Sequence, residues 1–310
     1  MTVFDAHCDT LQKITDTGKT LLHNSYHVDI ERIIETRNNY AQVFAAFINK
    51  EQDVFPPFLR CEQLIDKYFD EIKINSSFIR HCVNEREIKE AFNENKIASL
   101  LSIEGGEALE GKIENLNYFY NRGVRIITLT WNYSNEICDG IDVNKKGLSD
   151  FGKKVVSEMN DLGMMIDVSH ISEKGFWDVL EHTKKPVAAT HSNSRAICPH
   201  KRNLSDEQIC AIINNGGCIG INLYSPFLSE NESSIKNIIK HIEHILSLGG
   251  ENSIGLGCDF DGIDMLPEEI SGVQDLYKLF DELGRLSYSD LLIEKLSSRN
   301  FLELINENLI

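Results

Sequence analysis

Six side chains that suit divalent metal ions lie at or just after the ends of short apolar runs of the sequence. These residues are His7, Asp9, Glu104, His170, His191 and Asp259. Imidazole nitrogens and carboxylate oxygens without thiolates suit zinc, and they are also compatible with manganese, cobalt and iron. A water bound to such an ion loses its proton near neutral pH and becomes a nucleophile. The chemistry that these residues indicate is therefore hydrolysis.

The spacing of these residues predicts that they converge. Side chains two apart on a strand point to the same face, so His7 and Asp9 can bind one ion together. His170 and His191 each follow an apolar run and are 21 residues apart in the sequence. A strand, a helix and a second strand of a tight parallel unit need about that length, which places both imidazoles at the same ends of adjacent strands.

The number of candidate ligands predicts two metal ions rather than one. Three imidazoles, Asp9 and Glu104 are more ligands than a single catalytic zinc uses. A carboxylate can bridge two ions about 4 Å apart that share a water. Each motif is weak by itself, because a histidine at a strand end is more often a hydrogen-bonded residue, and the DFDG segment with Asp259 and Asp261 can be a plain turn. The prediction rests on their common position at the ends of strands.

Eight apolar runs rich in β-branched residues alternate with amphipathic stretches along the chain. The runs are Thr2–His7, Ala41–Ile48, Ile97–Ile103, Val124–Thr130, Met164–Val168, Val187–Thr190, Cys218–Asn222 and Ser253–Cys258. This alternation predicts a single (β/α)8 TIM-barrel domain over residues 1–310. The residues after Gly272 exceed one closing helix and predict extra C-terminal helices. An open doubly wound sheet is the main alternative, but Asp5–Thr10 lacks the glycines of its usual first loop.

Several residues mark the expected ends of helices and the expected wall of a pocket. Ser172 and Ser205 are expected N-caps, and Gly163 is an expected C-cap. The segments Asn24–Arg37 and Asn135–Lys146 are expected to shape the pocket.

Composition limits the classes of partner. The chain has 42% hydrophobic and 25% charged residues, which is typical of a globular protein. Its net charge of −17 argues against nucleic acid and against an anionic membrane as partners. No signal peptide and no apolar run that could span a bilayer are visible. Eight scattered cysteines without a CxxC pair indicate reduced thiols, so we expect a cytoplasmic protein.

These motifs, in this order, resemble the membrane dipeptidase family of renal dipeptidase-type zinc peptidases. The resemblance covers nearly the whole chain through DAHCDT, SIEGGEAL, VRIITLTWN, DVSHIS, THSNSRA with the following HKRN, and GLGCDFDGI. It implies a (β/α)8 barrel with two zinc ions per chain. One ion would be bound by His7 and Asp9 and the other by His170 and His191. Glu104 would bridge the two ions.

The resemblance also implies roles toward the substrate. Arg202 matches the position that binds the C-terminal carboxylate of a dipeptide, which suits a planar, permanently charged guanidinium. Asp259 matches the aspartate near the substrate amine or the proton-transfer path, so Glu104 and Asp259 are the expected catalytic residues. Animal members carry a histidine after TLT that stabilises the tetrahedral intermediate, whereas this chain has Trp131. Because an indole cannot take up a proton, that role is vacant or falls to Asn132 or a metal ion. Trp131 and Asn132 are expected to be substrate-binding residues, together with Arg202 and Asp259.

The predicted function is a binuclear zinc dipeptidase that hydrolyses dipeptides with a free C-terminal carboxylate. Family members often accept a D-residue in the second position. One alternative is another amidohydrolase-type amide or ester hydrolase, although these more often carry HxH on the first strand and a bridging lysine. The other is a catalytically silent barrel that only binds metal, for which Trp131 is the sole support. A small dipeptide is the expected partner, and the sequence leaves a homodimer open.

Overall fold

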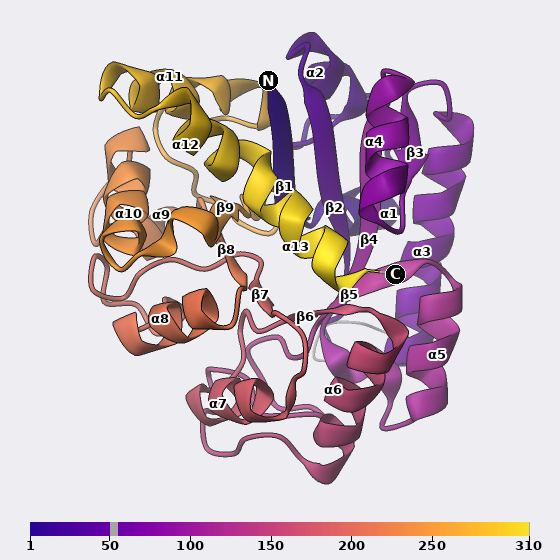
Figure 1. Ribbon diagram of the computed structural model, residues 1–310. Helices are drawn as coiled ribbons and strands as arrows, with labels where there is room; N and C mark the ends of the chain where they lie inside the picture. Colours follow the sequence, from indigo (N-terminus) through magenta and orange to yellow (C-terminus); the bar gives the residue numbers. More distant parts are fainter. Residues whose placement is uncertain (50–54, 310) are drawn as a thin grey trace.

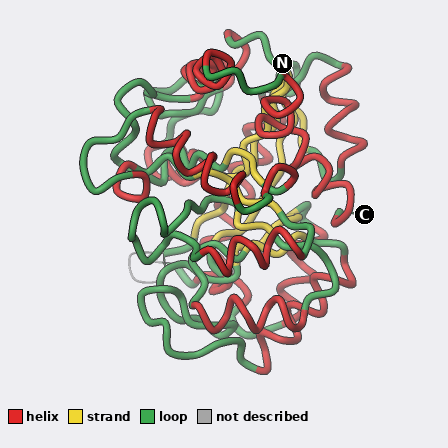
Figure 2. The backbone as a smooth tube through the Cα atoms, turned by 60° about the vertical axis from the view of Figure 1, so that its left-hand side comes forward, coloured by secondary structure: helices red, strands yellow, loops and turns green. Residues whose placement is uncertain are grey.

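Parallel strands close into a barrel that helices surround, as Figures 1 and 2 show. The computed structural model describes residues 1–49 and 55–309 of the chain. The barrel strands are β1 (Thr2–Cys8), β2 (Asn39–Phe47), β4 (Ile97–Glu104), β5 (Val124–Thr128), β6 (Met165–Asp167), β7 (Ala188–Ala189), β8 (Cys218–Ile221) and β9 (Ile254–Leu256). They are hydrogen-bonded in this order, and β9 pairs with β1 to complete the ring. The predicted (β/α)8 barrel is confirmed.

Each predicted apolar run coincides with a barrel strand, with ends that differ by two residues at most. A further short strand, β3 (Ile79–His81), was not predicted and pairs with the first residues of β4. Because β5 pairs only with Leu101–Glu104 of β4, β3 occupies the edge of β4 that β5 leaves free. Three residues, of which only Ile79 is apolar, give no periodicity that could have predicted it.

The helices begin and end largely where the capping residues predicted. Ser172 and Ser205 accept N-cap hydrogen bonds, and Gly163 ends its helix in the left-handed conformation at a φ of 68°. No helix of the described residues combines the length and apolar character needed to cross a bilayer. The helices are α1 (Thr10–Thr17), α2 (Ile30–Glu35), α3 (Pro57–Ile74), α4 (Glu85–Asn93), α5 (Ile113–Asn121), α6 (Asp150–Leu162), α7 (Glu173–His182), α8 (Asp206–Asn214), α9 (Ser225–Leu228), α10 (Ile235–Ser247), α11 (Tyr277–Arg285), α12 (Asp290–Glu294) and α13 (Asn300–Asn308).

Helix α13 closes the N-terminal end of the barrel and lies across the strands in Figure 1. Its Phe301 stacks on Phe4 with the ring centroids 5.4 Å apart, and a Cβ on Gly255 would overlap the Phe301 ring. The predicted extra C-terminal helices are therefore present, and the last of them seals the end opposite the carboxyl ends of the strands. Inward-facing residues of the other strands complete this apolar plug, namely Ala41, Ala98, Ile126, Met165, Ala188 and Cys218.

A β-bulge in β1 directs His7 to the inside of the barrel. Ala6 packs inside the barrel, in the core that α13 closes, so regular alternation would point His7 outward. The register between β1 and β2 shifts between Asp5 and Cys8, and Ala6 and His7 therefore share one partner position. Cys8 then packs outward against the helices. The extra residue of the bulge re-aims His7 toward the carboxyl end of the barrel interior.

The buried His241 of α10 ties the segment after β7 to the outer layer. Its Nδ1 accepts the N–H of Ser194 at 3.1 Å, so its Nε2 carries the proton and donates to the carbonyl of Leu228 at 3.1 Å. Burial disfavours the charged ring and lowers the pKa of His241 to about 4. Protonation would remove the acceptor that holds Ser194.

We expect acid to destabilise the protein through His241. In the unfolded chain this histidine has an ordinary pKa of 6.5, so as the pH falls from 6.5 toward 4 the unfolded chain binds a proton that the folded chain does not. Stability is therefore lost over this window, by at most about 3 kcal/mol. Denaturant unfolding in the presence of a chelator, at about pH 7 and about pH 4.5, should show a loss about 2 kcal/mol larger in the wild type than in His241→Gln. Equal losses in the two proteins would contradict this assignment.

Candidate metal centre

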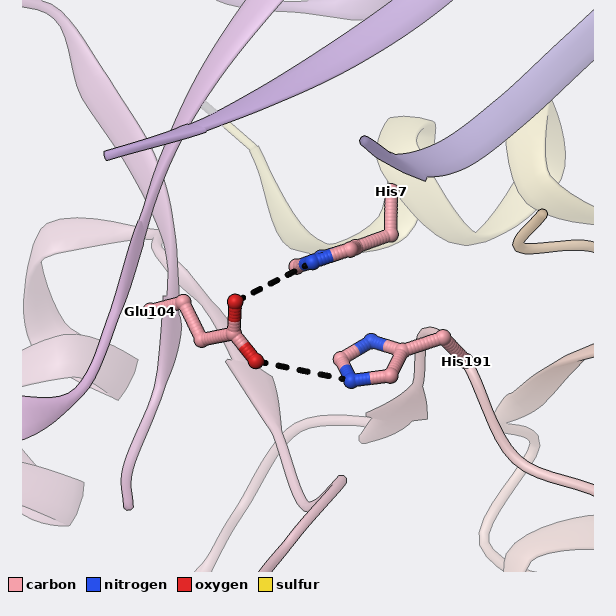
Figure 3. A group of neighbouring side chains, drawn as sticks. All are labelled: His7, Glu104 and His191. Carbon is pink, nitrogen blue, oxygen red and sulfur yellow. Dashed lines mark ion pairs between the residues drawn. The ribbon is translucent and has the colours of Figure 1, made fainter. Parts of the chain in front are cut away.

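Glu104, the last residue of β4, lies between two groups of side chains. Its Oε2 is 3.2 Å from His7 Nε2, which is itself 3.3 Å from Asp9 Oδ2. Its Oε1 is 3.1 Å from His170 Nε2 and 3.6 Å from His191 Nε2. Figure 3 shows the Glu104 carboxylate between the rings of His7 and His191. The structure thus brings the five predicted metal ligands together at the carboxyl end of the barrel, in two groups that share Glu104.

The local backbone differs among three of the candidate ligands, Asp9, His170 and His191. Asp9 is the N-cap residue of α1, but its side chain accepts no capping hydrogen bond and remains directed at the centre. His170 adopts a left-handed backbone with a φ of 67°, which is uncommon for a residue other than glycine. His191 follows β7 by two residues. Strained backbone of the kind seen at His170 is concentrated at functional sites.

Hydrogen bonds to Nδ1 leave the Nε2 atoms of two histidines free. His170 Nδ1 lies 2.8 Å from Asn132 Oδ1, and His191 Nδ1 lies 2.8 Å from Thr190 Oγ1. When each ring donates its Nδ1 proton to these oxygens, both Nε2 atoms carry lone pairs, and they are 2.8 Å apart. Two such lone pairs facing each other suit a shared cation. A second ring nitrogen held by an oxygen acceptor is the usual arrangement of metal-binding histidines.

Further buried atoms point to the centre without hydrogen-bond partners. Within the described part of the chain, these include His7 Nε2 and Asp9 Oδ1. Buried polar atoms without partners are rare, and each needs an explanation. Ligand atoms of His7, Glu104 and His191 lie within 4.8 Å of one another, as do those of His7, Asp9 and Asp259. These nitrogen and oxygen donors fit a divalent metal ion.

The pKa values of the three histidines are shifted in different directions. Burial, to which nearby positive charges add, lowers the pKa of His170 and of His191 well below the ordinary value. Burial also opposes the charged form of His7, but Glu104 and Asp9 outweigh it and raise the pKa of His7 well above its ordinary value. His170 and His191 therefore present neutral imidazoles, and the proton on His7 is one that a metal cation would displace.

Asp259 borders the same centre from the segment after β9. Its Oδ2 accepts a hydrogen bond from Asn222 Nδ2 at 2.8 Å, and its Oδ1 lies 3.9 Å from His7 Nε2. Burial raises the pKa of Asp259 well above its ordinary value; the charge of His7 opposes this shift, and Asp9 and Glu104 add to it. A carboxyl group in this position can hold a proton close to the reacting atoms, which is compatible with the predicted proton-transfer role.

Arg202 lies at the side of the centre, with N–H groups available to bind a ligand. It is 6% exposed, and its guanidinium lies 5.5 Å from the ring centroid of Phe227. Its Nη2 is 3.4 Å from the carbonyl oxygen of His191, and in the described residues its Nε is buried without a hydrogen-bond partner. Burial lowers the pKa of Arg202 to about 10, so the side chain stays charged at neutral pH. A charged, planar donor group in this state suits a carboxylate ligand.

A cavity of about 430 Å³ opens onto the centre, and its lining combines charged side chains with the aromatic rings of Phe47, Trp131, Tyr224 and Phe227. Trp131 lines it, edge-on to Phe47 with the ring centroids 5.3 Å apart. Asn132 also lines the cavity, but its Oδ1 is engaged by His170. Trp131 therefore has the position expected of a substrate-binding residue, whereas Asn132 primarily orients His170.

The two segments expected to shape the pocket do not line the cavity itself. Neither Asn24–Arg37 nor Asn135–Lys146 provides a lining residue, and the segments around Tyr224 and Gly262 line the cavity instead. The first loop acts one layer further out, because the backbone N–H of His27 donates to Asp261 Oδ1 at 2.7 Å. Sequence spacing could not show that this loop supports the rim rather than forming it.

Sequence reasoning also missed two residues behind the ligands. A Cβ on Gly262 would overlap Asp9 Oδ2 and Asp259 Oδ1, so the missing side chain makes room for two carboxylates. Asp167 is completely buried beneath the histidines. A signal was present in the sequence, because Asp167 is the single charged residue in the apolar run MMIDV.

A profile of the family described as membrane dipeptidase, peptidase family M19, matches residues 1–309. The chain belongs to the membrane dipeptidase family. An uncharacterized protein in the pqqA 5′ region of Klebsiella pneumoniae is 35% identical to it over 239 residues, which are 73% of this chain and 88% of that protein.

Solved structures of this family share the fold of the chain. A metallo peptidase from Rhodobacter sphaeroides, liganded with a phosphinate mimic of the dipeptide L-Ala-D-Ala, is 25% identical with a TM-score of 0.92 and covers 99% of each chain. A second structure, the dipeptidase AC of family M19, is also 25% identical with a TM-score of 0.92 and covers 100% of this chain and 99% of its own. The protein is a metal-dependent dipeptidase, and the predicted family and enzyme class are confirmed.

We expect Gly262→Ala to disable the centre of this dipeptidase. The new methyl group would displace Asp9 and Asp259, and a shift of about 1 Å in reacting groups can cost about 100-fold in rate. Steady-state kcat/KM for a dipeptide should therefore fall at least about 100-fold. Gly284→Ala is the matched control, because a Cβ there meets no atom within 4 Å, and it should keep full activity. Full activity in Gly262→Ala would show that the two carboxylates do not need this space.

Proposed function

We propose that this dipeptidase uses two zinc ions per chain, with Glu104 bridging them. The observation that carries this proposal is that the two oxygens of Glu104 face different ligand groups, His7 with Asp9 on one side and His170 with His191 on the other. A single catalytic zinc normally takes three protein ligands, and five converge here. The absence of thiolates among these ligands, together with three imidazoles, favours zinc over softer metals.

Zinc bound at this centre supplies Lewis-acid polarisation of the scissile carbonyl group and a water of lowered pKa. The protein supplies the proton path. Asp259, whose pKa is raised by burial, takes up the proton that the attacking water releases and gives it to the leaving amine. Asn222 fixes the Asp259 carboxyl group by its hydrogen bond to Oδ2. Asn132 and Thr190 hold the rings of His170 and His191 by their Nδ1 atoms.

Arg202 gives the cavity its selectivity for dipeptides. Its buried guanidinium has donors available for the C-terminal carboxylate of a substrate, and it lines the same cavity as Glu104 and Asp259. Because the carboxylate is bound at one side of the metal centre, only the peptide bond nearest to it comes within reach. Trp131 and Phe227 form apolar walls for the side chains of the substrate.

We also propose that the second residue of the substrate can be a D-amino acid. Support comes from the Rhodobacter sphaeroides metallo peptidase, which is liganded with a phosphinate mimic of L-Ala-D-Ala and is 25% identical over 99% of this chain. An α-carbon of either hand allows the carboxylate to meet a planar guanidinium, since the fork of Arg202 fixes the carboxylate rather than the side chain.

The first test is hydrolysis of a small panel by zinc-loaded protein with a chelated control. L-Ala-L-Ala and L-Ala-D-Ala should be cleaved and a tripeptide should not, because Arg202 binds the carboxylate close to the metal centre. The chelator should abolish cleavage, and metal analysis should give two zinc ions per chain. Cleavage of an N-acyl amino acid alone would place the specificity in the wider hydrolase group. Metal binding without any cleavage would support the silent barrel.

The second test removes the carboxylate-binding group. Arg202→Met should lower kcat/KM for L-Ala-L-Ala by roughly 30-fold to 5,000-fold, mainly through KM, because truncating one partner of a buried charge pair costs about 2 to 5 kcal/mol. The dipeptide amide L-Ala-L-Ala-NH2 is the matched substrate control, since it lacks the carboxylate and should lose little between wild type and variant. Equal losses for acid and amide would show that Arg202 does not bind the carboxylate.

A further inference from the structure

Asp167, the last residue of β6, is completely buried, and its side chain accepts four hydrogen bonds. The hydroxyl groups of Thr128 and Thr190 both donate to its Oδ2 at 2.6 Å. The backbone N–H groups of Ser169 and Thr190 both donate to its Oδ1 at 2.9 Å. Asp167 does not line the cavity, so it contacts neither the substrate nor the space for a metal ion.

The direction of the hydrogen bonds from Asp167 to His191 follows from their chemistry. Thr190 Oγ1 donates to Asp167 Oδ2, so the single hydroxyl proton of Thr190 is used in this hydrogen bond. The Thr190 oxygen must then accept from its other neighbour, the Nδ1–H of His191 at 2.8 Å. The proton of the neutral ring is thereby fixed on Nδ1, and the lone pair of Nε2 faces Glu104 Oε1 at 3.6 Å.

Thr190 is held in this position from its other side as well. A Cβ on Gly220 or on Gly257 would overlap the carbonyl oxygen of Thr190, so β8 and the segment after β9 approach its backbone closely. Its N–H and its hydroxyl are both bound by Asp167. Thr190 therefore cannot turn its hydroxyl group to another acceptor. Asp167 thus determines where the protons lie in the hydrogen-bond relay from Asp167 through Thr190 to His191.

We propose that Asp167 is a positioning residue that acts through Thr190 to hold His191 in the Nδ1–H form, the form that can bind zinc. This inference rests on the proposed zinc centre. Carboxylates, carbonyls and waters behind metal-binding histidines have this effect in general, and their loss typically lowers metal affinity by about 10-fold to 100-fold. Here the carboxylate acts across an intervening hydroxyl group.

Asp167→Asn tests the relay, because the amide has the shape of the carboxylate but carries a donor NH2 group in place of one acceptor oxygen. The two backbone N–H groups can only donate, so the amide oxygen must replace Oδ1, and the amide NH2 must replace Oδ2. The NH2 group then donates to Thr190 Oγ1, whose own proton is released toward His191 Nδ1. The ring changes to the Nε2–H form, which has no lone pair for a metal. One of the two zinc equivalents should therefore bind about 10-fold to 100-fold more weakly in competition with a chelating dye.

Three variants separate the relay from a loss of packing. Thr190→Val removes the hydroxyl and should lower zinc affinity in the same way, whereas Thr190→Ser keeps it and should restore near wild-type affinity. Thr128→Val is the matched control, because it deletes the other hydroxyl on Asp167 Oδ2, and among the described residues this hydroxyl makes no hydrogen bond to a metal ligand. It should lower thermal stability and leave zinc affinity within about threefold of wild type.

A direct measurement of the ring form completes the test. ¹⁵N shifts of histidine in chelator-treated protein should report the Nδ1–H form for His191 in the wild type and in Thr128→Val, and the Nε2–H form in Asp167→Asn. Unchanged ¹⁵N shifts or unchanged zinc affinity in Asp167→Asn would overturn the relay while leaving the dipeptidase proposal intact. A wild-type protein that binds no zinc would overturn the zinc centre and the relay together.

Discussion

The electrostatics of buried charge at the carboxyl end of the barrel control the rest of the site. The carboxylates of Asp9, Glu104 and Asp259 are each at most 9% exposed and lie around His7. Buried charges interact strongly because the dielectric constant around them is low, and removing them from water costs free energy. A proton on His7 compensates part of the negative charge, and a divalent cation compensates more. The neutral rings of His170 and His191 on the far side follow from the same constraint, because burial and nearby positive charge disfavour their protonation.

Much of the fold and the convergence of the candidate ligands could be predicted from the sequence. Alternation of β-branched runs with amphipathic stretches is a local signal, and it located all eight barrel strands. The carboxyl ends of parallel strands gather at one edge, so polar residues after each run could be assigned to one place without knowledge of the packing. For this reason Glu104, His170 and His191 were expected to meet, and they do. The family resemblance added the role of Arg202, which spacing alone could not provide.

The features that were missed depend on contacts between residues far apart in the sequence. The bulge at Ala6 and His7 is defined by the register with β2, and no local pattern reports register. The segment Asn24–Arg37 was expected to shape the pocket, and only the structure shows that it does so by supporting Asp261 through His27. Asp167 was visible as a charge in an apolar run, yet its link to His191 runs through the hydroxyl of Thr190, whose position no sequence pattern reports. Direct ligands could be found from residue type, whereas the groups that orient them required three-dimensional geometry.

Because α13 seals the barrel with Phe301 stacked on Phe4, the first and last elements of the chain must meet before the core is complete. At about 5 to 20 residues per second, β1 leaves the ribosome roughly 15 to 60 s before α13 does. For most of this interval β9 has not yet been made, and until its end α13 does not cover the apolar N-terminal end of the strands. Asp259 also emerges long after His7. The site is therefore complete only after late-synthesised residues at and after β9 have packed beside β1.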